Sequence, residues 1–239
     1  MKLHYNRPHL AKKILGFDLV LVFLHFARRT IRPHLAKRRL KPQSTENVLG
    51  KSLVIAEKPS VATDIARVLK APRDKSKDFF ENDDYVISSA VGHLLTIIVP
   101  PEQEIKRGKW TFDKLPHIPT HFDLEPIAKS EARLRVLLRL IKRDDIDCLV
   151  NACDAGREGE LIFRYIIQYA IAKHPKKTAG KSVSRLWLQS MTPDAIRTGF
   201  ANLRSDDDMK PLANAASCRS EADWLVGING TRAMTAFNS

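Results

Sequence analysis

Hydrophobic and polar positions along residues 52–205 follow the pattern of short strands that alternate with amphipathic helices. Apolar runs bounded by polar turns predict buried strands, and apolar residues three and four positions apart predict helices. Strands that alternate with helices favour a parallel sheet covered by helices on both faces. The expected strands are residues 52–56, 85–90, 148–152 and 183–188, with an extended piece at 122–126, and the expected helices are residues 60–69, 129–142, 158–172 and 192–202.

Capping residues set the expected helix boundaries. We expect Ser60 to cap the first helix, and Thr192 to cap the last one with Pro193 in its first position. After Pro211 the pattern is helical to about Ala233, which indicates the start of a second, helical domain over residues 206–239. The chain stops there without a closing element, as expected of a truncated domain.

The first 51 residues differ from the rest in charge and pattern. They hold 12 Lys and Arg against 2 Asp and Glu, whereas the remainder holds 28 against 25. An apolar stretch at residues 14–27 is too short for a comfortable membrane span. We expect a basic, poorly ordered extension. Three interpretations of it stay open: a non-native or mis-started segment, a DNA-binding arm, and a membrane-surface helix.

Composition permits a folded core but leaves little excess charge in it. The chain has 239 residues, 44% of them hydrophobic, and a net charge of +13 that comes mostly from the extension. A basic groove in the folded part must therefore come from the placement of charges. Cys148, Cys153 and Cys218 form no Cys-x-x-Cys pair, which argues against a structural zinc site and favours free thiols in a reducing cytosol.

An acidic cluster directly follows the apolar run at residues 147–153: Asp154-Ala155-Gly156-Arg157-Glu158-Gly159-Glu160. Such a strand-to-helix turn lies at the carboxyl edge of a sheet, where α/β folds bind ligands. Carboxylates close together repel one another unless a cation or a proton lies between them, and Mg²⁺ prefers oxygen ligands. Glu57 ends another predicted strand in the same way, so the two segments are expected to converge on one metal.

The segment Glu57-Lys58-Pro59-Ser60 together with residues 154–160 resembles the Toprim domain, a Rossmann-like metal-binding core of topoisomerases and bacterial primases. Further segments follow in the order of one family, and with them residues 52–239 resemble the amino-terminal part of a type IA DNA topoisomerase of the bacterial topoisomerase III kind. These segments are residues 91–94, 109–110, 115–119, 185–187, 191–196, 219–227 and 231–233. The resemblance implies a Toprim domain over residues 52–205.

The resemblance also implies catalytic and metal-binding roles. Glu57 would be the general acid, which returns as the base on rejoining, and Lys58 would support the phosphate charge. Glu57, Asp154 and Glu158 would hold Mg²⁺, with Glu160 as a weaker candidate. The family pattern Asp-x-Asp-x-Glu-Gly is interrupted here, because Gly156 stands where the second Asp would be. We therefore expect weaker or more water-mediated metal binding. Capping of the following helix is an open alternative role for the two acids of the turn.

Five basic residues are expected to contact DNA by the same resemblance: His93, Arg157, Arg185, Arg219 and Arg232. For Arg219 and Arg232 a buried ion network with Asp223 is an equal alternative. Trp110 is expected to pack rather than to stack on a base.

The nucleophile of the family is a tyrosine in a Tyr-Pro-Arg-Thr-like context, which this sequence does not contain. Its tyrosines are Tyr5, Tyr85, Tyr165 and Tyr169. We therefore expect a fragment that binds Mg²⁺ and single-stranded DNA but does not cleave alone. The family implies strand breakage, passage and rejoining without ATP, through a 5′-phosphotyrosine, on single-stranded segments of negatively supercoiled or interlinked duplex.

The same resemblance places the protein in the bacterial cytoplasm at the nucleoid, with no membrane and no obligate protein partner. Two alternatives stay open: another Toprim enzyme such as a primase or nuclease, and a non-catalytic nucleic-acid-binding module.

Overall fold

The computed structural model describes residues 50–76, 78–105 and 110–238, which belong to one compact unit, Asn47–Ser239. The expectations for residues 1–49 of the amino-terminal extension, for Tyr5 and for Lys109 concern positions outside these ranges, whereas Lys51, which we expected to belong to the extension, is the first residue of a strand.

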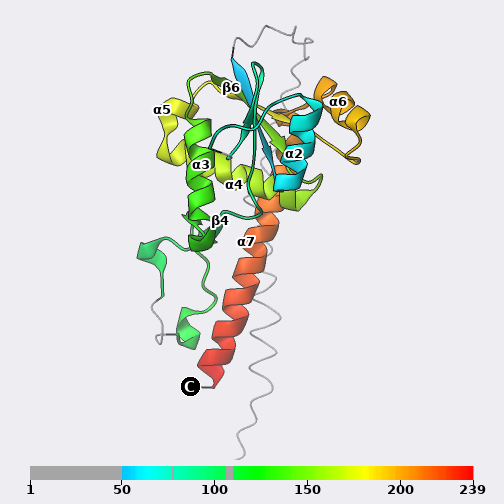
Figure 1. Cartoon of the computed structure of the whole chain (residues 1–239). Helices are drawn as coiled ribbons and strands as arrows, with labels where there is room; N and C mark the ends of the chain where they lie inside the picture. The colour runs from blue at the N-terminus through cyan, green and yellow to red at the C-terminus, as the bar shows by residue number, and fades with distance from the viewer. Residues whose placement is uncertain (1–49, 77, 106–109, 239) are drawn as a thin grey trace, which may run out of the picture. The chain divides into compact units, whose positions relative to one another are not determined.

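A six-stranded sheet forms the centre of this unit (Figure 1). Four neighbouring strands are parallel, and a two-residue strand pairs antiparallel at each edge. The prediction of a parallel sheet is confirmed, whereas the edge strands were not predicted and the strand expected at 183–188 is shorter. The order is β2 (Phe80–Glu81), β3 (Tyr85–Ser89), β1 (Lys51–Ala56), β6 (Ile146–Ala152), β7 (Ser182–Arg185) and β8 (Arg204–Ser205).

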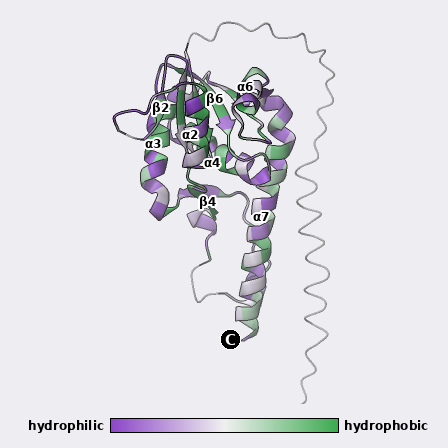
Figure 2. Ribbon diagram, turned by 45° about the vertical axis from the view of Figure 1, so that its right-hand side comes forward, coloured by the Kyte–Doolittle hydropathy of each residue, from purple (hydrophilic) through white to green (hydrophobic). Residues whose placement is uncertain are grey.

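Helices cover both faces of the sheet, as the sequence predicts. Side chains of β1 alternate between the two faces. Val54 packs with the helices α2 (Pro59–Val68) and α6 (Pro193–Ala201). Leu53 packs on the other face with α3 (Glu131–Ile141) and α4 (Arg157–Lys173), which is followed by the short α5 (Pro175–Thr178). Figure 2 shows hydrophilic and hydrophobic residues alternating along α3, as expected of a helix with one buried face.

The observed helix starts correct one prediction and confirm another. The cap position of α2 is Lys58, and Pro59 takes the first turn, so Ser60 is not the cap. The fixed φ of proline suits that position, where its missing N–H is not needed. Thr192 caps α6 as predicted, since its hydroxyl accepts a hydrogen bond from the Ala195 N–H at 3.3 Å.

The long helix α7 (Asp206–Phe237) begins earlier than predicted and contains Pro211. Ser205 caps it by accepting from the Asp208 N–H at 3.2 Å, and three aspartates in its first turn complement the helix dipole. Pro211 is the sixth residue of the helix, so its missing N–H removes one helical hydrogen bond, to the Asp207 carbonyl. Among the helices that the structure describes, none is both long and apolar enough to span a bilayer.

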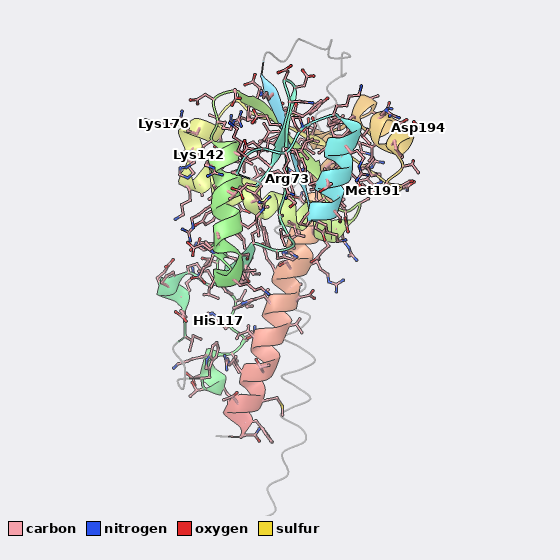
Figure 3. The ribbon with its side chains drawn as sticks, viewed as in Figure 1. Arg73, His117, Lys142, Lys176, Met191 and Asp194 are labelled. Carbon is pink, nitrogen blue, oxygen red and sulfur yellow. The ribbon has the colours of Figure 1, made fainter. Side chains whose placement is uncertain are left out.

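Beside α7 lies a small layer built on the antiparallel pair β4 (Leu95–Ile98) and β5 (Asp123–Pro126). The His117 N–H donates to Asn229 Oδ1 of α7 at 2.6 Å, and Asn229 Nδ2 donates to the His117 carbonyl at 3.0 Å. Figure 3 shows His117 beside the lower half of α7. Short 3₁₀ turns connect this layer: η1 (Pro101–Gln103), η2 (Phe112–Lys114) and η3 (Ala128–Ser130).

Candidate functional site

Three neighbouring parallel strands deliver the candidate site residues to one edge of the sheet. Ala56 pairs with Ser89 of β3 and with Ala152 of β6, so β1 lies between the other two strands. Glu57 follows β1 directly, His93 follows β3, and Asp154 follows β6. The edge predicted from two strand ends is thus formed by three.

Glu57 is largely enclosed at this edge, with a side chain that is 14% exposed. Its Oε2 atom is buried and has no hydrogen-bond partner among the described residues. Its backbone carbonyl accepts from the Val91 N–H at 2.8 Å. Val91 and Gly92 have φ values of 64° and 82°, a left-handed turn that is costly for a β-branched residue. This strained turn leads into His93.

Lys58 lies between the two acids that the sequence predicts to converge. Its Nζ atom is 2.7 Å from Asp154 Oδ2 and 3.9 Å from Glu57 Oε1. The hydrogen bond to Asp154 raises the pKa of Lys58, and the charges of Asp154 and Glu57 raise it further. An ammonium therefore occupies the place between the two carboxylates where the sequence predicts a metal cation.

The turn after β6 is tight because Gly159 comes close to its backbone. A Cβ atom at Gly159 would lie 2.2 Å from the Asp154 carbonyl oxygen, so only glycine fits. Gly156 is different, since nothing lies within 4 Å of the Cβ it lacks. Within this turn, the close approach therefore requires glycine at Gly159 and not at Gly156.

Glu158 points to His93 and not to the other two acids. The carboxylate Oε1 and His93 Nε2 form a very short contact. The Glu158 side chain is 71% exposed, so the pair lies at the open side of the site. Among the described residues, no three His, Cys, Asp or Glu side chains are gathered as metal ligands. The proposed trio of Glu57, Asp154 and Glu158 is thus brought to one edge but not assembled around a common point.

The prediction that Arg185 contacts DNA is wrong, because its side chain lies inside the domain. The residue is 1% exposed. Its Nη1 donates to the Cys153 carbonyl at 2.7 Å, and its Nη2 donates to the Asp154 carbonyl at 2.7 Å. Burial lowers the pKa of Arg185, while the Glu160 carboxylate opposes that shift. Arg185 therefore stabilises the acidic turn by hydrogen bonds from the interior of the domain, and it is not accessible to DNA.

Two polar residues lie beneath the turn: Glu160, which belongs to the predicted acidic cluster, and Asn151, which the sequence pattern did not assign to the site. Glu160 is fully buried and accepts from Asn151 Nδ2 at 2.9 Å. Asn151 Oδ1 in turn accepts from the Cys153 N–H at 3.0 Å. The signal for this support was an asparagine within an apolar strand, because a buried polar side chain requires partners.

A cavity of about 640 Å³ opens beside the acidic turn. Its walls include His93 and Arg157, and α7 contributes Arg219 and Asp223. Arg219 Nε lies 3.0 Å from Asp223 Oδ2, and both side chains are more than 60% exposed. The alternative of a buried ion network is therefore wrong for this pair.

Arg232 lies apart from that cavity. Its guanidinium stands 5.3 Å from the centre of the Trp110 ring, and both line a second cavity of about 570 Å³ with Trp224. Trp110 also packs against His117, with ring centres 5.7 Å apart. The five predicted DNA contacts are thus divided: three line the first cavity, one lines the second, and Arg185 is buried.

A model of the Toprim domain family matches residues 52–186. The chain belongs to the Toprim domain family. The proteins named DNA topoisomerase 3 of Bacillus subtilis (strain 168) and Bacillus anthracis are each 41% identical to it over 192 residues, which is 80% of this chain and 25% of each relative. The chain therefore spans about a quarter of the length of these curated relatives. Over the matched residues its Toprim portion is similar to that of topoisomerase III.

The Toprim site offers two acids that fit a magnesium ion without a protein cage. Glu57 Oε2 is buried without a partner, and the Asp154 side chain is half exposed. Mg²⁺ is commonly held by one or two carboxylates and keeps several waters. The chemistry of this donor set fits such an ion, provided that the Lys58 ammonium moves aside.

Two of the cysteines, Cys148 and Cys153, lie in and directly after β6, and the third, Cys218, lies in α7. Cys148 and Cys153 are buried and free, as predicted, whereas Cys218 is partly exposed. Burial raises the pKa of Cys153, which keeps it as an unreactive thiol beside the acidic turn.

Proposed function

We propose that this chain is the magnesium- and DNA-binding portion of a type IA topoisomerase of the topoisomerase III kind, an isomerase that breaks, passes and rejoins single strands without ATP. The observation that carries the proposal is the arrangement of Glu57, Lys58 and Asp154 at one sheet edge, with a buried Glu57 oxygen that lacks a partner. The similarity to proteins named DNA topoisomerase 3 supports it. In this proposal residues 52–205 are the Toprim domain and residues 206–239 begin a helical domain.

Glu57 and Lys58 would act on the phosphodiester directly. A tyrosine oxygen that has lost its proton to water would attack phosphorus, the bond to the 3′ oxygen would break, and the carboxyl group of Glu57 would give its proton to that oxygen. On rejoining, the same carboxylate takes the proton back. Lys58 would leave Asp154 and pair with a phosphate oxygen, which balances the negative charge of the pentacovalent phosphate.

Glu57 and Asp154 would hold Mg²⁺, with Glu158 as a third ligand once it leaves His93. The ion supplies positive charge beside the phosphate when it is bound. Water molecules would complete its ligand set next to Gly156, where no side chain occupies the space.

The partner would be DNA, as single-stranded segments of negatively supercoiled or interlinked duplex in the bacterial cytoplasm at the nucleoid. His93, Arg157 and Arg219 line the cavity beside the acidic turn and would contact its phosphates. None of the described tyrosines lines that cavity. Tyr165, for example, is buried and donates to Ser220 Oγ at 3.0 Å. We therefore propose that this chain alone binds DNA without cleaving it.

Fluorescence anisotropy with a labelled single-stranded oligonucleotide tests the proposal. We expect binding that is stronger with Mg²⁺ than with EDTA, stronger than binding to a duplex of equal length, and about three- to tenfold weaker in Arg219→Gln. Arg197→Gln on α6, which removes an equally exposed arginine, is the matched control.

Two further outcomes separate the alternatives. Cleavage of the oligonucleotide in Mg²⁺ without a covalent protein–DNA product would favour a nuclease. No binding by the wild-type chain, or equal loss in Arg219→Gln and Arg197→Gln, would overturn the proposed DNA site. A plasmid relaxation assay should yield no relaxed topoisomers.

A further inference from the structure

Helix α7 is connected to the helix that follows the acidic turn by a guanidinium shared between two carboxylates. Arg164 of α4 places Nε 2.7 Å from Glu160 Oε1 and Nη1 2.6 Å from Asp206 Oδ1. Glu160 is fully buried, and Asp206 is the first residue of α7. Asp206 Oδ1 is itself a buried atom, and the Arg164 guanidinium is the positive charge that faces it.

The other carboxylate oxygen of Glu160 faces Arg185, the residue that is hydrogen-bonded to the backbone of the acidic turn. Glu160 Oε2 lies 3.5 Å from Arg185 Nε. Arg185 donates to the Asp154 carbonyl at 2.7 Å, as described above. A continuous row of alternating charges therefore leads from the backbone of Asp154 through Arg185, Glu160 and Arg164 to the start of α7.

The row is charged and balanced, with two guanidinium groups and two carboxylates. Burial lowers the pKa of Arg164, but the Glu160 and Asp206 carboxylates outweigh that effect and raise it. Removing Arg164 leaves the buried Glu160 charge with less compensation, while Arg164 and Asp206 themselves are 22% and 32% exposed, so the cost lies between that of a buried pair and that of a surface pair. The position of α7 should therefore depend on this row more than on the exposed ion pairs of its first turn.

A second polar contact joins the same two helices farther along. Tyr165 OH donates to Ser220 Oγ at 3.0 Å. Ser220 lines the cavity, as do Arg219, Ala216 and Leu161. Asp206 and Ser220 are about 21 Å apart along a helix at 1.5 Å per residue, so two separated contacts fix the direction of α7.

We propose that Arg164 is a positioning residue that fixes α7 relative to the acidic turn, so that Arg219 faces the cavity beside Asp154. This inference rests on the proposed function in that it assigns Arg219 to bound DNA. Loss of the Arg164–Asp206 contact should therefore weaken DNA binding, although Arg164 itself does not contact DNA. Arg164 does not line the cavity, which is consistent with an indirect role.

The test uses the full chain and a double-mutant cycle of Arg164→Gln and Asp206→Asn. Each single variant should weaken binding of a labelled single-stranded oligonucleotide about three- to tenfold, and the double variant should be no weaker than Arg164→Gln alone. Arg164→Lys keeps a charge that can meet one carboxylate and should restore part of the affinity. Mg²⁺ affinity, measured by calorimetry, should stay within about twofold in all of them, because a general loosening of the domain would lower both affinities.

Lys210→Gln is the matched control. Lys210 also belongs to the first turns of α7, but its ion pair with Asp207 is exposed. If Lys210→Gln weakens DNA binding as much as Arg164→Gln does, or if the cycle is additive, the positioning role is overturned in favour of a simple effect of net charge.

Hydrogen exchange of the amides at 206–220 distinguishes this inference from the proposed function. Arg164→Gln and Asp206→Asn should each speed exchange there, with Lys210→Gln unchanged. If the wild-type chain does not bind DNA but exchange responds in this way, the DNA site fails and the positioning of α7 stands. If exchange at 206–220 is unchanged in both variants, the positioning role is wrong whatever the DNA affinity.

Discussion

Lys58 Nζ lies 2.7 Å from Asp154 Oδ2, although the two residues are 96 positions apart in the chain. Neighbouring parallel strands make this contact possible, since β1 and β6 end side by side at Ala56 and Ala152. The ammonium and a metal ion would compete for the same carboxylate. The Toprim site thus contains its own cation, which Mg²⁺ would have to displace from Asp154 or which a DNA phosphate would attract away from it.

Removal of that ammonium should strengthen metal binding. We expect Lys58→Gln to bind Mg²⁺ about three- to tenfold more tightly in calorimetry, because two acids then lack a nearby positive charge. Lys176→Gln, on α5, removes an equal charge from an exposed position and should change nothing. Weaker Mg²⁺ binding by Lys58→Gln would show that the lysine supports the metal and does not compete with it.

Gly159→Ala should destabilise the domain by about 1–3 kcal/mol in urea unfolding, since its Cβ would lie 2.2 Å from a backbone oxygen that cannot rotate away. The better helix propensity of alanine, about 1 kcal/mol, is smaller than this cost. Gly156→Ala, where the Cβ meets nothing within 4 Å, should cost less than about 1 kcal/mol. Equal stability of the two variants would contradict the close approach of α4 to the turn.

Gly156→Asp should add a carboxylate to the acidic turn without a steric clash, because the position faces open space. We expect Mg²⁺ affinity to rise about three- to tenfold, as an added negative oxygen donor replaces water. Gly156→Asn, which has the same shape without the charge, is the control for calorimetry. An unchanged affinity in Gly156→Asp would place the metal away from this turn.

Stability should fall in acid through Glu81. Hydrogen bonds from Arg143 at 2.6 and 2.9 Å lower the pKa of Glu81 below its ordinary value of 4.5; burial opposes this, and Lys51 at 2.6 Å adds to it. A carboxyl group whose pKa is lower in the folded state stabilises the fold above the unfolded pKa. That stability is lost as the pH falls through the folded value.

Glu81→Gln should therefore lower the free energy of unfolding by about 1–2 kcal/mol at pH 7, and its difference from the wild type should shrink below pH 4.5. Urea unfolding at several pH values measures this. Asp194→Asn, which breaks the exposed pair with Arg197, should differ little from the wild type at any pH. A difference for Glu81→Gln that persists below the folded pKa would exclude the charge as its cause.

The edge of the site could be predicted from sequence because it depends on local pattern. Apolar strands that end at Glu57 and before Asp154 can pair in parallel only with both acids at one edge. The burial of Arg185 could not be predicted in this way. An arginine at a strand end is usually exposed. The guanidinium of Arg185 is buried because the turn at residues 153–154 folds over it, which only the structure shows.

The hydrogen-bond and ion-pair partners of long polar side chains could not be predicted from the sequence either. Glu158 contacts His93 and Glu160 contacts Arg164, although both acids lie in the first turn of the same helix. Their spacing by two positions places them on different sides of α4, which a motif alone does not reveal. The edge strands β2 and β8 are only two residues long and carry no periodic signal.

Calorimetric titration with Mg²⁺ of the wild type, Glu57→Gln, Asp154→Asn and the double variant measures whether Glu57 and Asp154 hold one magnesium ion together. We predict one site in the wild type, a loss of affinity of about tenfold or more in each single variant, and no further loss in the double variant. Independent, additive losses, or a wild-type affinity that survives both substitutions, would contradict a shared metal site at this edge of the sheet.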